Sequence, residues 1–216
     1  MSNKISKISK LKNIESFLQI NFLKGFQYID NAGKIINKYQ SNTGEVLYNM
    51  SPDRLLIYKP TSDIEELKIS NVDFWMHYVS PRNLGETLRT YIKETEEILK
   101  IIEVDDILRI GWRNYFVFEL INNETDLNKL SKISQAAVQS MFLRTDFDKD
   151  TKLTTNIKLL QRKDNKNKKV IMFDMDLYQE KKVDLQTAVR SFSMLKTYFE
   201  SDKTLQLINE IIALLK

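Results

Sequence analysis

The chain has 216 residues, of which 42% are hydrophobic and 29% are charged, a composition typical of a globular protein with a sizeable core. Its 33 basic and 29 acidic residues leave a formal charge of only +4, which is weak for a protein dedicated to duplex DNA. Because the chain has no cysteine and one histidine, disulfides, thiolate zinc sites and histidine-rich metal sites are excluded.

The glycines and the apolar runs exclude further classes of protein. All five glycines lie within the first 111 residues, and they form neither a Walker loop nor a dinucleotide-binding fingerprint. The sequence has no run of 18 apolar residues to cross a membrane, and its lysine-rich start lacks the continuous apolar core of a secretion signal. We therefore expect a cytoplasmic protein with no cofactor and no membrane partner.

The first 80 residues contain mostly strand patterns. Asn13 to Phe26 fits a helix and a strand about equally well, and both alternatives stay open. Ala32 to Tyr39 has the pattern of a short helix with Asp30 or Asn31 as its N-cap, followed by a turn at residues 42–44. We then expect an antiparallel meander of four strands. These strands are Glu45 to Met50, Arg54 to Lys59, Glu65 to Ser70 and Val72 to Val79.

A long amphipathic helix is predicted after the meander. Apolar residues recur at helical spacing from Leu84 to Ile102, with charged residues on the other faces. Asn83 and Glu86 have the spacing of a capping pair at its start. The pattern predicts a helix that packs one face against a sheet.

The clearest pattern of the chain is the strand from Leu108 to Leu120. One set of alternate residues in it is almost wholly apolar, including Trp112, and is expected to face the core. The other set places Arg109 and Arg113 on either side of Gly111. The strand is therefore predicted to carry a basic stripe on its second face.

The second half continues with helix, strands and helices. Residues from Thr125 to Leu143 have a helical pattern. Two strands joined by a charged loop at 163–169 and then two helices are expected. These strands and helices are Thr151 to Arg162, Val170 to Tyr178, Asp184 to Glu200 and Asp202 to Lys216.

This element order predicts an α+β fold, with an antiparallel sheet, helices packed on one side and a long C-terminal helical segment. We expect a single domain over residues 1–216. Two closely packed halves, at about 1–104 and 105–216, would each consist of strands followed by helix.

The segment Arg109-Ile-Gly-Trp-Arg113 resembles the Arg-Ile-Gly-apolar-Arg signature of an uncharacterised, sporadically distributed bacterial family of about this length. The resemblance extends over about residues 74–216, with the late strand from Val170 to Tyr178 and the helix through Phe199 in the expected places. The chain departs from the family at Asn114, which separates Arg113 from Tyr115, and in lacking a histidine in the last helix.

The resemblance implies a fold rather than an activity, because that family has no established function. Its sporadic occurrence is compatible with a setting in mobile elements or phage defence. We treat this setting as an implication of the resemblance alone.

Asp174 and Asp176 stand two residues apart and are expected to project from one face of a strand. Such a pair binds Mg²⁺ in some nucleotide- and phosphoryl-transferring enzymes, so a magnesium-dependent enzyme is one alternative. The preferred interpretation is that the two aspartates form ion pairs with Arg109 and Arg113 across a shared polar face. We therefore expect no metal site and name no catalytic residue.

A second group of candidates combines basic and aromatic side chains. Lysines that track phosphates and aromatic rings that stack on bases would suit a nucleic-acid or nucleotide ligand. The alternative is that the lysines belong to a solvated loop and that His77 is a packed side chain rather than an acid-base catalyst. The nucleic-acid candidates are Lys163, Lys166, Lys168 and Lys169. The binding candidates are Arg109, Arg113, Tyr115, Asp174, Asp176, Trp75 and His77.

These observations favour a non-catalytic binding or interaction protein, with a regulatory or chaperone-like role as one form of it. The partner is expected to be another protein or a second copy of the chain, bound at an open sheet face or at the C-terminal helices. The apolar residues of those helices exceed what one narrow core stripe needs. Nucleic-acid or nucleotide binding through a basic sheet face is the alternative.

Overall fold

The structure is a computed structural model and describes residues 5–23, 25, 27–43, 45–81, 83–119, 140–161 and 169–215. Its centre is one nine-stranded antiparallel sheet with the strand order β2-β3-β4-β5-β1-β6-β9-β8-β7. The strands are β1 (Lys12–Phe22), β2 (Leu47–Ser51), β3 (Arg54–Tyr58), β4 (Glu66–Ser70), β5 (Asp73–Val79), β6 (Ile107–Glu119), β7 (Ser140–Asp146), β8 (Thr151–Gln161) and β9 (Lys169–Val183).

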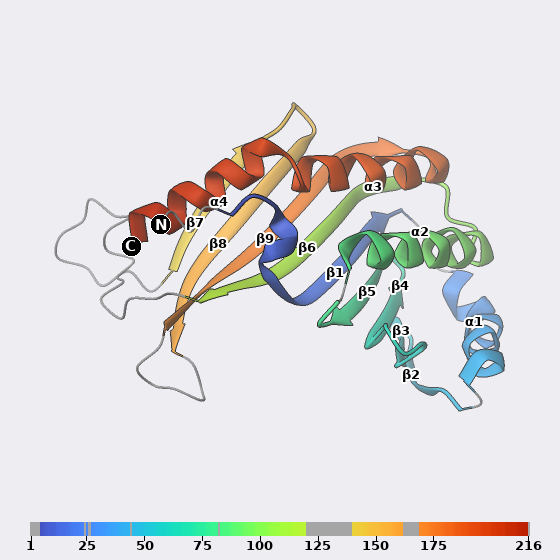
Figure 1. Cartoon of the computed structure of the whole chain (residues 1–216). Coiled ribbons are helices and arrows are strands. Elements are labelled where there is room, and N and C mark those ends of the chain that lie inside the picture. The colour runs from blue at the N-terminus through green and yellow to red at the C-terminus, as the bar shows by residue number, and fades with distance from the viewer. Residues whose placement is uncertain are drawn as a thin grey trace.

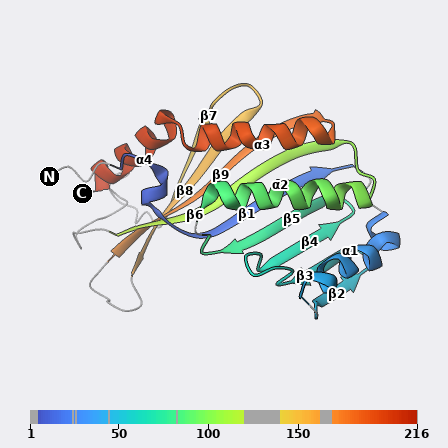
Figure 2. The same cartoon turned by 45° about the vertical axis from the view of Figure 1, so that its right-hand side comes forward.

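In the described part of the chain, four α-helices lie on the same face of this sheet (Figures 1 and 2). They are α1 (Gln27–Thr43), α2 (Leu84–Ile101), α3 (Leu185–Phe199) and α4 (Asp202–Leu215), and a short 3₁₀ turn, η1 (Ile8–Lys10), precedes β1. The predicted α+β class, with an antiparallel sheet and helices on one side, is confirmed. The C-terminal helical segment is broken into two helices of 15 and 14 residues, so only part of it is continuous.

Helix starts follow the expected capping chemistry. The side chain of Asn83 accepts hydrogen bonds from the backbone N–H groups of Gly85 and Glu86, as the predicted cap requires. Asp184 caps α3 in the same way by accepting from the N–H of Thr187.

Three sequence-based expectations are corrected or decided by the structure. Asn13 to Phe26 fitted helix and strand equally, and its residues up to Phe22 belong to strand β1 because β5 and β6 pair with this strand on both sides. The predicted helix at Ala32 to Tyr39 is only the middle of α1. Ser140 to Leu143, predicted as helix, belongs to strand β7, and the preceding part of that prediction lies outside the described residues.

The two halves of the chain meet at the middle of the sheet. β1 and β6 pair there, with β5 beyond β1 and β9 beyond β6. Along the chain, α2 follows β5 just as α3 follows β9. The other strands of the first half thus lie beyond β1, and the other strands of the second half lie beyond β6.

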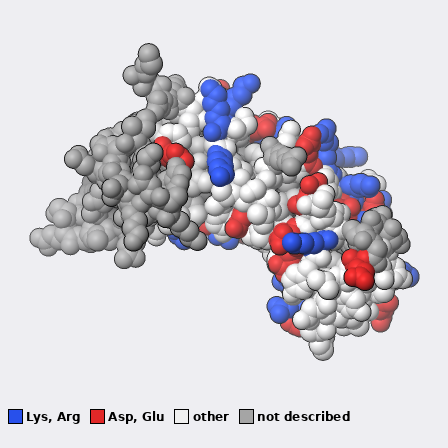
Figure 3. Space-filling view, turned by 60° about the horizontal axis from the view of Figure 1, so that its bottom comes forward, with Lys and Arg blue, Asp and Glu red and all other residues white. Residues whose placement is uncertain are grey.

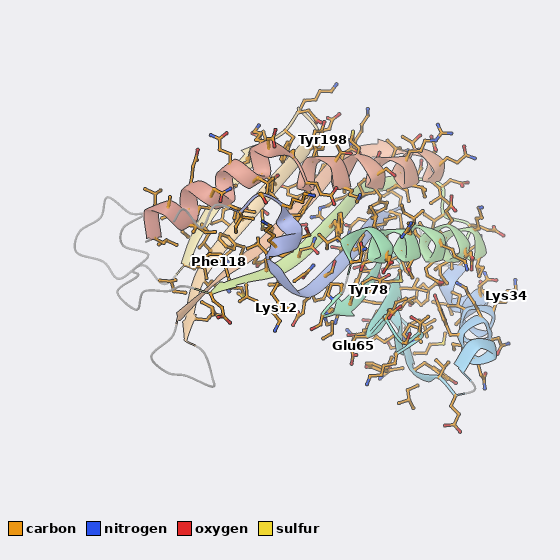
Figure 4. All side chains as sticks on the ribbon, in the orientation of Figure 1. Lys12, Lys34, Glu65, Tyr78, Phe118 and Tyr198 are labelled. Atoms are coloured by element: carbon orange, nitrogen blue, oxygen red, sulfur yellow. The ribbon has the colours of Figure 1, made fainter. Side chains whose placement is uncertain are left out.

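The core lies between the sheet and the helices. Trp112 of β6 is fully buried there. It belongs to the set of alternate residues that the sequence pattern assigned to the core. Its ring lies 5.5 Å from that of Phe199 in α3, which also packs on Phe116 at 5.7 Å. The indole Nε1–H donates a hydrogen bond to Ser16 Oγ at 2.9 Å. Figure 4 shows side chains filling this layer, with Tyr78 of β5 beneath α2.

We predict that Phe199→Ala lowers the free energy of unfolding by about 3–5 kcal/mol, because it leaves a cavity against Trp112 and Phe116. Urea denaturation measures this loss. Leu214→Ala is the control, since the side chain of Leu214 is in the same pair of C-terminal helices but 58% exposed. Equal losses in the two variants would contradict the packing described here.

Candidate functional site

The second face of the sheet is not covered by any described helix (Figures 1 and 2). Alternate residues of each strand point to this open face. On β6 they include Arg109, Gly111, Arg113 and Tyr115, whereas Ile110 and Trp112 face the core. The predicted basic stripe therefore lies on the open face.

The arginines of the stripe form ion pairs with the aspartates of β9. Arg113 donates from Nε and Nη2 to the two carboxylate oxygens of Asp174, each at 2.7 Å. Arg109 donates from Nη2 to Asp176 at 2.8 Å. The cross-strand ion pairs expected from the sequence are confirmed, and β6 and β9 are adjacent antiparallel strands as this pairing requires.

The surroundings of the two pairs differ. The side chain of Asp174 is 7% exposed and that of Arg113 is 47% exposed, so the carboxylate is buried beneath its partner. The hydrogen bond to Asp174 raises the pKa of Arg113, which keeps the guanidinium charged. Burial raises the pKa of Asp176, and the nearby charges of Arg109 and Arg113 oppose this shift.

Gly111 provides the space for the Arg109 side chain. A Cβ atom added at Gly111 would lie 2.8 Å from Arg109 Nη1 and 3.2 Å from its Cζ. The guanidinium carbon also lies 4.7 Å from the centre of the Tyr178 ring, within cation–π distance. The glycine between the arginines thus lets one guanidinium lie close to the sheet backbone.

An aromatic cluster on β1, β5 and β6 borders the ion pairs. Phe17 is at its centre, stacked on His77 with ring centroids 4.2 Å apart. Trp75 and Tyr115 lie 6.1 Å and 5.9 Å from the same phenyl ring. His77 is a packed side chain, with Nε2 3.7 Å from a Glu15 carboxylate oxygen.

The cluster and the ion pairs together enclose a hollow of about 310 Å³ in the open face. Lys68 reaches it from β4 and pairs with Asp73 at 3.0 Å. Sequence reasoning missed Phe17, Gln19, Lys68 and Asp73 because they come from other strands. The hollow is lined by Phe17, Gln19, Lys68, Asp73, Trp75, Arg109, Gly111, Arg113, Tyr115 and Asp176.

The other sequence candidates are placed differently. Lys163, Lys166 and Lys168 lie outside the described residues, and Lys169 begins β9. Among the described residues there is no group of three or more histidines and acids arranged to hold a metal ion. Asp174 and Asp176 are each occupied by an arginine, so the magnesium alternative gains no support from the geometry.

Comparison of the chain with protein-family models, curated proteins and solved structures gave no match. Within the described part of the chain, helices are too short or too polar to cross a membrane.

We predict a coupling energy of about 1–2 kcal/mol between Arg113 and Asp174 in a double-mutant cycle of Arg113→Gln and Asp174→Asn. The buried carboxylate and its two charged hydrogen bonds favour a high value, and exposure of the guanidinium reduces it. Chemical denaturation of the four proteins provides the measurement. The exposed Arg144–Asp146 pair of β7 is the control, and equal coupling there would show that burial contributes nothing.

We predict that Gly111→Ala leaves the fold intact and weakens the pairing of Arg109 with Asp176, because the new Cβ displaces the end of a flexible side chain. Stability should stay constant or rise, since glycine in a strand costs roughly 0.5–1 kcal/mol relative to alanine. Coupling between Arg109 and Asp176 is measured with and without the substitution. A large loss of stability, or unchanged coupling, would contradict the proposed role of Gly111.

Proposed function

We propose that the chain is a non-catalytic binding protein that holds a polypeptide partner against the open face of its sheet. The hollow at the centre of this face carries the proposal. It combines Trp75, Tyr115, Arg109 and Arg113, and these residue types dominate the energetic centres of protein interfaces. Their aromatic surfaces and hydrogen-bonding groups suit a partner with both apolar and polar side chains.

The charges of the hollow favour a polypeptide over a nucleic acid. Binding to phosphates depends on cations that release counterions from the nucleic-acid backbone. Here Lys68, Arg109 and Arg113 are each paired with an aspartate. Figure 3 shows scattered acidic and basic side chains on the described part of the molecule in view, without one continuous basic band. The cations around the hollow are therefore already balanced by aspartates.

The arrangement of titratable groups supports a non-catalytic role. The aspartates of the hollow neutralise neighbouring cations, and His77 is stacked on Phe17. A general base needs to reach a substrate proton, whereas these groups are engaged with each other. A regulatory or chaperone-like protein of the cytoplasm would use such a face. Membership of the sporadic bacterial family, with its link to mobile elements or phage defence, remains a prediction.

Site-specific photo-crosslinking tests this proposal. A photoreactive phenylalanine analogue replaces Trp75 in the hollow or, as control, Leu214 on the helical side, and the protein is irradiated in its host cells. We expect adducts from position 75 that protease digestion removes and nuclease digestion does not, with few adducts from position 214. The yield at position 75 should fall when Arg113→Ala is added.

Two outcomes would count against the proposal. Adducts at position 75 that are sensitive to nuclease would instead support the nucleic-acid alternative. Equal yields from positions 75 and 214, or no effect of Arg113→Ala, would show that the hollow is not a specific binding surface.

A further inference from the structure

Strand β2, Leu47–Ser51, forms one edge of the sheet. Within the described part of the chain it pairs with β3 alone. In an antiparallel pair, alternate backbone N–H and C=O groups of an edge strand point away from the neighbouring strand. The outer side of β2 therefore offers a row of backbone groups that another strand can pair with.

The sequence of β2 does not protect this edge. Natural edge strands usually carry charged residues or proline, which discourage pairing with other chains. Leu47–Ser51 contains neither. At the opposite edge, β7 carries Arg144 and Asp146, which form an ion pair with each other. The two edges of the sheet are thus built differently.

The apolar layer of the core is also open at β2. Tyr48 pairs with Ile57 and Met50 pairs with Leu55, so all four side chains lie on the helix-covered side of the sheet. Leu55 and Ile57 are fully buried, whereas Tyr48 and Met50 are 54% and 43% exposed. Helix α1 packs on β3, and its Tyr28 hydroxyl reaches the end of β2 by donating to the backbone oxygens of Ser51 and Pro52, but Tyr48 and Met50 stay exposed. A strand added to β2 would extend this layer and bury the two side chains.

We propose that the partner of this edge is β2 of a second copy of the chain, in an antiparallel pair with its two-fold axis at Asn49. This register uses the whole strand and places Tyr48 opposite Met50 of the second copy, and Leu47 opposite Ser51. Strand β2 carries no charge, so self-pairing meets no repulsion between like charges. The two nine-stranded sheets would join into one continuous sheet.

This dimer goes beyond the proposed function and leaves it intact. The second copy adds in the plane of the sheet, so the hollow on the open face stays accessible in both copies. A five-residue strand and its flanking side chains bury less area than the roughly 1,000 Å² expected of a stable interface. We therefore expect a weak dimer that dissociates on dilution.

Sedimentation velocity over a range of concentrations tests the dimer with two double variants of matched exposure. The wild-type protein should change from monomer to dimer as the concentration rises. Tyr48→Lys with Met50→Lys places like charges opposite each other and should give a monomer throughout. Tyr48→Glu with Met50→Lys places a glutamate opposite a lysine twice across the axis and should restore the dimer.

Each remaining outcome overturns the proposal. A wild-type protein that stays monomeric at its highest soluble concentration shows that β2 does not self-pair. A dimer that persists with both lysines places the interface elsewhere, and equal behaviour of the two double variants excludes the register centred on Asn49. Phe142→Lys on the exposed face of β7 is the control and should leave dimerisation unchanged. Thermal melting followed by circular dichroism verifies that every variant is folded.

Discussion

The pairing of β1 with β6 is the constraint on which the rest of the structure depends. These strands come from the two halves of the chain and pair along nearly their whole length, from Lys12 with Val117 to Phe22 with Ile107. One face of the pair contributes Leu18 and Trp112 to the core. The other presents Phe17 and the arginine stripe of β6. The core and the candidate site therefore share one register.

The ion pairs on the open face bear on the neighbouring register, that of β6 with β9. A slip of one residue between strands would turn every side chain of one strand to the opposite face. For β6 and β9, such a slip would move charged side chains into the core, where they would lack partners. The bidentate bond between Arg113 and Asp174 is also directional, so it favours one alignment of the two strands. Polar and apolar faces thus specify the same pairing.

The sequence predicted features that depend on the residues of one strand. Alternation within 108–120 was enough to assign Trp112 to the core and both arginines to the open face. It could not locate Phe17 or Lys68, because strand pairing brings them to the hollow from distant parts of the chain. The segment of β1 fitted two periodicities equally, and only its neighbours decide between them. Residues 140–143 were misassigned for the same reason, since their alternation is short and was included in a helical pattern.

The side chains of the open face hold one another in place. The carboxylate of Asp174 is already buried beneath Arg113, so a partner that covers the guanidinium would not have to desolvate both charges. Arg113 binds Asp174 through Nε and Nη2, which fixes the plane of the guanidinium before a partner arrives. Less conformational entropy is then lost on binding. The aromatic rings around Phe17 are likewise held by contacts with each other. If the proposed partner binds a face with fixed rings and paired charges, shape and hydrogen bonding would select it rather than net charge.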